Sequence, residues 1–259
     1  MSEDPDFTQF ISQIKRKTAI DLSQYKEAQM KRRLTTLRMK HGFATFGDYY
    51  SAIEGNRALL NEFLDRMTIN VSEFWRNPQR WEVLQKVFLP EIASASLRPR
   101  IWSAACSTGE EPYTIAMILS EMGLLDRTTL LATDLDMGVL QKAQEGIYLE
   151  RSLRDVPKTS RNKYFKTSEG AYAVSEVLKK AVTFKQGNLL YDKFESGFDL
   201  IVCRNVMIYF TEEAKHQLYH KFAGALKPGG ILFVGSTEQI FSPAQYGFET
   251  ADTFFYRRT

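Results

Sequence analysis

Short apolar runs separated by helical patterns fill the chain from Arg100 onward, and this alternation constrains the fold more than any other feature of the sequence. Strands that alternate with helices form a parallel sheet with right-handed crossovers. The five expected parallel strands are Ile101–Ala105, Thr129–Thr133, Val182–Lys185, Phe198–Cys203 and Ile231–Val234. Thr253–Arg257 is expected to close the sheet, antiparallel to the segment around 246–248. The pattern therefore predicts a doubly wound α/β sheet with an antiparallel last strand.

The first 75 residues show no strand alternation and are expected to form a small N-terminal helical domain. Its helical patterns are Asp6–Ile14, a second that runs from a cap at Asp21 or Ser23 to Lys40 and stops at Gly42, Phe46–Ile53 and Leu59–Met67. We expect a linker helix at 76–99 and the sheet domain at 100–259. The crossover between the second and third strands is too long for one helix, so residues 146–180 are expected to form a small inserted β-subdomain.

The stretch Ile101–Tyr113 has the pattern of a strand, a tight turn at Gly109, two acids and the start of a helix. Glycine at the turn lets the backbone approach a ligand closely. The acids Glu110 and Glu111 would repel a pyrophosphate, whereas S-adenosylmethionine carries a sulfonium and an ammonium group. The segment resembles the first loop of S-adenosylmethionine methyltransferases, and its Glu-Glu-Pro-Tyr resembles the chemotaxis receptor methyltransferase (CheR) family. A strand-to-helix corner with solvated acids is the alternative.

The resemblance to this family covers nearly the whole chain, from Phe10 to Tyr256, and five segments match in the right order. It implies a protein-glutamate O-methyltransferase of bacterial chemotaxis adaptation. Such an enzyme transfers a methyl group from S-adenosylmethionine to glutamate side chains of chemoreceptors and leaves S-adenosylhomocysteine. In some members the inserted sheet docks a receptor tail pentapeptide, and the sequence leaves that question open here.

Ligands of such sheets bind beyond the carboxyl ends of the strands, so the residues that end each strand are the candidates for the cofactor site. After the first strand, one acid can accept a hydrogen bond from the cofactor's ammonium. The resemblance favours Glu111, although the sequence alone does not separate it from Glu110. Asp134 ends the second strand and can accept from both ribose hydroxyls, unless it is a helix cap. Asp136 is expected to cap the following helix.

The third and fourth strands add four more candidates and one residue for the acceptor channel. Asn188 offers the donor and acceptor that adenine requires, and Leu189 can flank the ring; an ordinary turn asparagine is the alternative. Arg204 and Asn205 follow the fourth strand. The resemblance implies that this pair touches the cofactor. Tyr209 could line the acceptor channel, but an ordinary buried aromatic explains it equally well.

The segment Thr68–Arg76 lies outside the expected sheet and also matches the family. The resemblance implies that Asn70, Ser72 and Arg76 reach over the cofactor from the junction between the domains. A guanidinium at Arg76 suits the cofactor's carboxylate through paired hydrogen bonds. A helix boundary capped by Ser72 is the alternative.

Methylation of a glutamate places few demands on the protein. A carboxyl group with a pKa near ~4.3 is about 99% ionised at pH 7, so the nucleophile needs no general base. His216 and His220 stand four apart on an expected helix, but no third ligand lies nearby in the sequence, and we expect no metal. Catalysis should therefore rest on alignment of the reactants and exclusion of water.

The expected helix from Ser23 to Gly42 is basic and indicates the partner. Met30, Leu34 and Leu37 form its apolar stripe by spacing. The resemblance implies that this helix meets the acidic methylation helices of receptors. The residues that we expect to bind the receptor are Lys31, Arg32, Arg33, Arg38 and Lys40. A solvated charged helix is an alternative, and nucleic acid is the rival partner.

Composition sets the remaining limits. The net charge of +3 is too small to demand nucleic acid, and no run of 18 or more apolar residues could span a membrane. The N-terminus lacks the apolar core of a signal peptide. Cys106 and Cys203 have no partner at metal-ligand spacing and are expected to be reduced, half-buried thiols. We expect a cytoplasmic monomer; a nucleic-acid or small-molecule methyltransferase and a cofactor-sensing binding module are the alternative functions.

Overall fold

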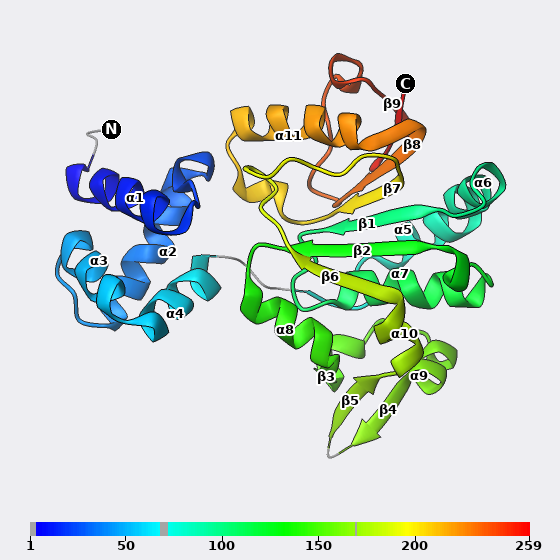
Figure 1. The fold of residues 1–259 in the computed structure, drawn as a ribbon, viewed down its shortest axis with the longest axis horizontal. Helices are drawn as coiled ribbons and strands as arrows, with labels where there is room; N and C mark the ends of the chain where they lie inside the picture. The colour runs from blue at the N-terminus through cyan, green and yellow to red at the C-terminus, as the bar shows by residue number, and fades with distance from the viewer. Residues whose placement is uncertain (1–3, 68–71, 169) are drawn as a thin grey trace. The chain divides into compact units, whose positions relative to one another are not determined.

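The computed structural model describes residues 4–67, 72–168 and 170–259, and its contacts divide the chain into two compact units (Figure 1). The helical unit consists of Met1–Ile69 and Val206–Gln217. The sheet unit consists of Asn70–Asn205 and Leu218–Thr259. None of the helices in the described ranges is long and apolar enough to cross a membrane.

Aromatic side chains form the core of the helical unit. Its elements are α1 (Pro5–Thr18), the 3-10 turn η1 (Leu22–Gln24), α2 (Glu27–Lys40), α3 (Phe46–Gly55) and α4 (Arg57–Met67). Phe10 of α1 is fully buried and contacts Phe46, Tyr49 and Phe63, at ring-centroid distances of 5.1, 6.1 and 5.9 Å. The helical character of this part of the chain is confirmed.

The start of α2 differs from the sequence prediction. Asp21 accepts a hydrogen bond from the Ser23 amide at 3.1 Å and caps the separate turn η1. Helix α2 then begins at Glu27 behind Lys26, which forms no side-chain cap. The prediction that Asp21 or Ser23 caps α2 is wrong, because the Asp21 carboxylate caps the short 3-10 turn η1 instead.

The segment Val206–Gln217 returns to the helical unit after the fourth parallel strand of the sheet unit. The Lys26 amide donates to the Tyr209 carbonyl at 2.9 Å, and the rings of Tyr25 and Phe210 lie 5.1 Å apart. The 3-10 turn η5 (Met207–Tyr209) and the first residues of α11 (Glu212–Ala225) belong to this segment. The helical unit is therefore built from two separate parts of the chain.

The main sheet has the strand order β6-β2-β1-β7-β8-β10-β9. Its strands are β1 (Arg100–Ala104), β2 (Thr129–Asp134), β6 (Val182–Gln186), β7 (Phe198–Cys203), β8 (Leu226–Val234), β9 (Phe248–Asp252) and β10 (Phe255–Arg258). The first five are parallel, and β10 runs antiparallel to both β8 and β9. The predicted doubly wound sheet with an antiparallel last strand is confirmed.

Successive residues of β1 face opposite sides of the main sheet, as a pleated strand requires. Ile101 belongs to the larger apolar core, to which α7 (Glu110–Glu121), α8 (Met137–Glu145) and α10 (Glu176–Ala181) contribute. The succession α5 (Pro78–Val83), the π-turn η2 (Leu84–Phe88) and α6 (Leu89–Ala95) contributes to the same core. Trp102 faces the other side and lies 5.8 Å from the Phe222 ring of α11. Short 3-10 turns at η3 (Leu125–Arg127) and η6 (Pro243–Tyr246) complete the unit.

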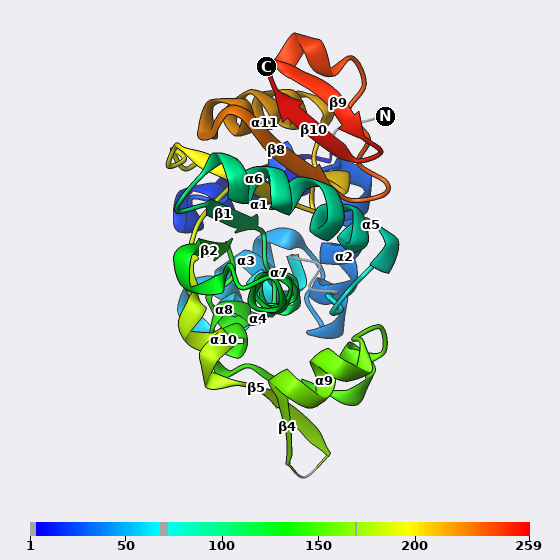
Figure 2. The ribbon, with the colours of Figure 1, turned by 90° about the vertical axis from the view of Figure 1, so that its right-hand side faces the viewer.

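A second, three-stranded sheet is inserted between α8 and β6, and it protrudes from the sheet unit (Figure 2). Its order is β3-β5-β4, with all pairs antiparallel. Its elements are β3 (Ile147–Leu149), η4 (Glu150–Leu153), α9 (Lys158–Tyr164), β4 (Phe165–Ser168) and β5 (Ala171–Val174). The Phe74 ring packs against Tyr148 and Phe165 at 4.8 and 5.2 Å. The expected inserted β-subdomain is confirmed.

Candidate functional site

The loop between β1 and α7 holds three residues with left-handed backbone within five positions. Ala105, Ser107 and Gly109 have φ values of 63°, 49° and 94°. A side chain at Gly109 is also sterically excluded, because a Cβ there would lie 2.9 Å from Ala143 Cβ. Non-glycine residues in this conformation cost about 1–3 kcal/mol each and cluster at ligand sites. The tight turn at Gly109 that the sequence indicated is therefore present, and its close approach to a ligand stays a prediction.

Asp134 ties the end of β2 to that loop. Its carboxylate accepts hydrogen bonds from the Ser107 amide at 2.8 Å and from the Asp136 amide at 3.0 Å. Burial raises the pKa of Asp134 to about 6, although these backbone donors lower it. Asp136 accepts from Gly138 at 2.7 Å and is the N-cap of α8, so the predicted cap is confirmed. The ribose assignment of Asp134 stays a prediction.

The two acids that begin α7 point to different partners. Glu111 accepts a hydrogen bond from the Ser103 hydroxyl at 2.9 Å, and its other oxygen lies 3.8 Å from an Nη of Arg204. Burial raises the pKa of Glu111 to about 7, while Arg204 and Ser103 lower it. Glu110 instead accepts from the Thr108 hydroxyl at 2.6 Å. Glu111 therefore joins a charged network with Arg204, whereas Glu110 binds Thr108 of its own loop and Ser72 of the segment before α5.

Arg204 is the most enclosed charged group of this network, with its side chain 3% exposed. It donates to the Arg76 carbonyl at 2.7 Å and to Asn77 Oδ1 at 3.2 Å. Its guanidinium lies over the rings of Trp81 and Phe233, at 4.9 and 4.8 Å. Burial lowers the pKa of Arg204, and its Nε has no hydrogen-bond partner in the described part of the chain. This arginine fixes the segment around Arg76 against the end of β7.

The segment before α5 brings two predicted residues toward the same network. Ser72 donates a hydrogen bond to Glu110, which opposes the rise that burial causes in the pKa of Glu110. The positive charge of Arg76 lowers the pKa of Glu111 and of Arg204, so its guanidinium lies near that pair. Asn70 lies outside the described residues.

Asn205 is held in a left-handed turn by a carboxylate that the sequence analysis missed. The backbone φ of Asn205 is 62°, and its amide donates to Glu238 at 2.6 Å. Gly235 donates to the same oxygen of Glu238 at 2.8 Å. Glu238 is 5% exposed and follows β8, so the strand-end rule that found the other candidates could have found it as well.

Asn188 is a turn residue, as the alternative interpretation had it. Its Oδ1 accepts from the amides of Leu190 and Tyr191, at 3.0 and 3.3 Å, so its acceptor is already used. Leu189 is buried, and its carbonyl accepts from Lys221 at 2.7 Å. Contact of the Asn188 amide group and Leu189 with adenine stays a prediction.

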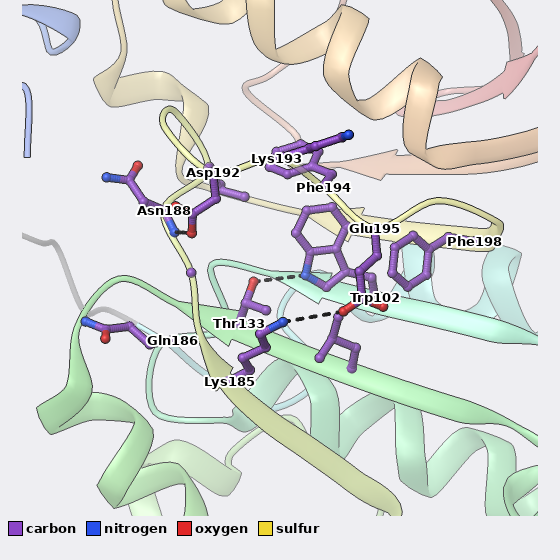
Figure 3. A pocket seen from close by; sticks show the side chains of 13 residues that line it. Trp102, Thr133, Lys185, Gln186, Asn188, Asp192, Lys193, Phe194, Glu195 and Phe198 are labelled. Carbon is purple, nitrogen blue, oxygen red and sulfur yellow. Dashed lines mark hydrogen bonds and ion pairs between the residues drawn. The ribbon is translucent and has the colours of Figure 1, made fainter. Parts of the chain in front are cut away.

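Asn188 and Leu189 also border a pocket on the α11 face of the main sheet (Figure 3). Trp102 lies at its centre and donates through Nε1 to Thr133 at 2.9 Å. The Phe194 ring stands 4.7 Å from the Trp102 ring. The other residues that line the pocket are Leu131, Lys185, Gln186, Gly187, Asp192, Lys193, Glu195 and Phe198. The pocket is floored by sheet side chains and aromatic rings, and the strained loop at Ser107–Gly109 does not line it.

In the helical unit, most of the predicted receptor-binding residues already have partners. Lys31 pairs with Asp4 at 2.9 Å, and Lys40 pairs with Glu62 at 2.7 Å. Arg33 donates to the Met67 carbonyl at 2.8 Å, and Arg38 donates to the carbonyls of Phe43 and Ala44. Arg32 is exposed, and its side chain has no hydrogen bond or ion pair with the residues that the structure describes. The predicted stripe of Met30, Leu34 and Leu37 is buried, which confirms it.

The remaining candidates are Tyr209, the two histidines and the two cysteines. Tyr209 belongs to the helical unit, where its ring lies 5.8 Å from the Arg33 guanidinium. The His220 ring packs on Tyr246 at 5.1 Å, and the described residues contain no group of three or more side chains able to hold a metal. Cys106 and Cys203 are free and fully buried, so the prediction of half-buried thiols is wrong in degree.

Comparison with protein families matches both parts of the chain. Residues 5–68 match the model of the CheR methyltransferase all-alpha domain, and residues 70–255 match that of the CheR methyltransferase SAM binding domain. SAM is S-adenosylmethionine. The family suggested by the sequence motifs is therefore the one that the family models match.

Curated relatives match over nearly their full lengths. A chemotaxis protein methyltransferase of Listeria monocytogenes is 43% identical over 255 residues, which cover 98% of this chain and 97% of the relative. One of Listeria innocua has the same identity and coverage. One of Borreliella burgdorferi is 39% identical over 236 residues, which cover 85% of this chain and 83% of that protein.

Proposed function

This chain belongs to the CheR methyltransferase family, and on that premise we propose how its two units bind the cofactor and the acceptor protein. It is an S-adenosylmethionine-dependent chemotaxis methyltransferase that methylates glutamate side chains of chemoreceptors. The sheet unit holds the cofactor at the carboxyl ends of β1, β2, β6 and β7. Two observations carry this assignment: the buried pair of Glu111 and Arg204, and the loop after β1, whose Ser107 amide donates to Asp134.

The chain's own residues fit the groups of S-adenosylmethionine. The cofactor supplies an electrophilic methyl group on a sulfonium when bound. Glu111 accepts from the ammonium, which would favour its ionised form against the burial that raises its pKa to about 7. Arg76 holds the carboxylate through paired hydrogen bonds, and Asn70 and Ser72 also bind the cofactor in this proposal. Gly109 brings the loop backbone close to the cofactor, and no other residue fits there because a Cβ would lie 2.9 Å from Ala143 Cβ.

The ribose, adenine and reactive end of the cofactor are assigned to the other strand ends. Asp134 accepts from the ribose hydroxyls, and the amide group of Asn188 with Leu189 contacts adenine. Arg204 and Asn205 lie toward the reactive end, where Arg204 also neutralises Glu111. The protein binds, orients and excludes water, and the acceptor glutamate arrives already ionised, so no general base takes part. Tyr209 lines the acceptor channel in this proposal.

The partners of the helical unit are the acidic cytoplasmic helices of methyl-accepting chemoreceptors. Helix α2 steers them through its basic face, and Arg32 contributes most because its charge is exposed and unpaired among the described residues. We assign the enzyme to the cytoplasm, where the thiols of Cys106 and Cys203 stay reduced, and propose that it acts as a monomer.

The proposal is tested with labelled S-adenosylmethionine and a receptor cytoplasmic fragment. Base-labile label on receptor protein is the expected result, and label on RNA or on no acceptor would contradict it. Asp134→Ala should weaken S-adenosylhomocysteine binding, because hydrogen bonds to a charged group are worth about 1.5–3 kcal/mol each. Calorimetry that shows unchanged affinity would contradict the ribose assignment. Arg127→Ala, on the far side of the sheet unit at η3, serves as the control.

A further inference from the structure

Tyr148 of the inserted sheet reaches the strained loop after β1. Its hydroxyl donates to the Thr108 carbonyl at 2.6 Å. The same hydroxyl would lie 3.0 Å from a Cβ at Gly109, so it occupies the space that glycine leaves open. Residues 108 and 148 are joined by a hydrogen bond across 40 positions of sequence. The inserted sheet is therefore in direct contact with the loop assigned to the cofactor.

The side chains around Tyr148 fix the direction in which its hydroxyl points. The Tyr148 ring is 6% exposed and stands edge-on to Phe74 at 4.8 Å and to Tyr113 at 6.4 Å. Burial raises the pKa of Tyr148 well above its ordinary value, so the hydroxyl stays protonated and remains a donor. On its other side Thr108 is bound through its own hydroxyl to Glu110 at 2.6 Å. Thr108 is thus held between the inserted sheet and the start of α7.

We propose that Tyr148 is a positioning residue for the cofactor, and that the inserted sheet sets cofactor affinity by holding Thr108 and Gly109 through it. The inference rests on the proposed function, because it takes the Ser107–Gly109 loop as part of the cofactor site. Tyr148 acts through the loop backbone and does not itself touch the reacting atoms. Loss of its hydroxyl should therefore weaken cofactor binding more than it slows methyl transfer once the cofactor is bound.

Tyr113 provides a matched control within the same cluster. Its hydroxyl is also buried and also donates to a backbone carbonyl, that of Ala143 at 2.8 Å in α8. Tyr113→Phe removes the same atom from the same aromatic cluster but leaves the bond to Thr108 in place. A general loosening of the core would affect both variants alike, whereas a positioning role distinguishes them.

The experiment compares Tyr148→Phe, Tyr113→Phe and Asp134→Ala in the full chain. Tyr148→Phe should raise the S-adenosylhomocysteine Kd and the S-adenosylmethionine KM by about three- to tenfold, the range for one lost hydrogen bond. Its kcat at saturating cofactor should change less than about twofold, and amides of residues 105–110 should exchange faster with solvent. Tyr113→Phe should leave the Kd unchanged, although its melting temperature falls.

The outcomes separate the two proposals. If Asp134→Ala weakens binding and Tyr148→Phe does not, the positioning role is overturned and the cofactor site stands. If both tyrosine variants raise the Kd equally, the effect is general and the positioning role is again overturned. If Asp134→Ala and Tyr148→Phe both leave the Kd unchanged, the cofactor site is misassigned and the inference fails with it.

Discussion

Two groups of charged side chains have opposite surroundings: those at the carboxyl ends of the main-sheet strands are buried, and those on α2 are more exposed. The Arg204 side chain is 3% exposed and lies over two aromatic rings, whereas the side chain of Lys40 is 57% exposed. A buried charge is costly to leave without its partner, while an exposed pair contributes little. We therefore propose that charges at the carboxyl ends of the strands determine geometry and cofactor affinity, and that charges on α2 act on the encounter with a partner.

The largest difference between the two regions should come from removing one charge of a pair. Arg204→Met leaves Glu111 buried without its cation and should lower the free energy of unfolding by about 3–5 kcal/mol. Lys40→Met breaks an exposed pair with Glu62 and should change it by less than about 1 kcal/mol. Urea denaturation measures the free energy of unfolding of both variants. Equal losses in the two variants would contradict the difference between buried and exposed charges.

Glu238 should rank next, because one of its oxygens accepts two backbone hydrogen bonds. Glu238→Ala should lower the free energy of unfolding by about 1.5–3 kcal/mol, since bonds to a charged group lie in that range. It should also weaken S-adenosylhomocysteine binding, as Asn205 leaves its left-handed turn. Glu238→Gln keeps an acceptor oxygen and should fall between the wild type and the alanine variant. An alanine variant with native affinity would mean that the Asn205 turn holds without its carboxylate.

The third prediction concerns pH. Burial raises the pKa of Glu111 from an ordinary 4.5 to about 7, so the folded chain binds a proton there more tightly than the unfolded chain. Its contribution to stability is therefore present below about pH 4.5 and is lost as pH rises toward 7. Binding of S-adenosylhomocysteine should have the opposite trend, because the ammonium group that we propose to bind Glu111 needs the ionised carboxylate. Affinity should rise by up to about tenfold per pH unit below pH 7.

Glu111→Gln is the control for this pH dependence. The variant has no titrating group at that position, so its affinity should be lower than that of the wild type and nearly constant between about pH 5.5 and 7, where an α-amino group stays protonated. Calorimetric titrations of both proteins across that range make the test. A slope that survives in the glutamine variant would assign the titration to another group, such as Asp134, whose pKa burial raises to about 6.

The smallest effect should come from the exposed charge on α2. Arg32→Glu should reduce receptor methylation severalfold at low salt, and the deficit should shrink as the Debye length falls to about 3 Å at 1 M salt. Arg57→Glu on α4 makes the same charge change at another exposed site and should have a smaller effect. The S-adenosylhomocysteine Kd should stay unchanged in both. Initial rates at several salt concentrations test this, and equal deficits in the two variants would contradict steering by α2.

Local patterns predicted the sheet and the strand ends well. Apolar runs such as Phe198–Cys203 coincide with β7, and the cap at Asp136 is where its spacing put it. Strand direction follows from the intervening helices, so the edge that carries Asp134 and Arg204 was also predictable. These features depend on residues that are close in sequence, so the sequence alone is enough to predict them.

Interactions between distant residues account for what the sequence did not predict. Arg204 binds the carbonyl of Arg76, which lies 128 positions away, and Glu238 holds Asn205 from 33 positions away. The partners of the basic residues on α2 were hidden for the same reason, since Arg33 binds Met67 and Lys40 binds Glu62. The sequence at Asn188 fitted both adenine binding and a turn, and in the structure its Oδ1 accepts a hydrogen bond within the turn.

The split composition of the helical unit has a consequence for synthesis of the chain. Residues 4–67 leave the ribosome first and carry the aromatic core around Phe10. Tyr25 and Lys26 are made before their partners Phe210 and Tyr209, which are translated more than a hundred codons later. At about 5–20 residues per second this delay lasts roughly ten to forty seconds. A fragment that ends after α4 would therefore lack Tyr209 and Phe210, the partners of Lys26 and Tyr25 in the helical unit.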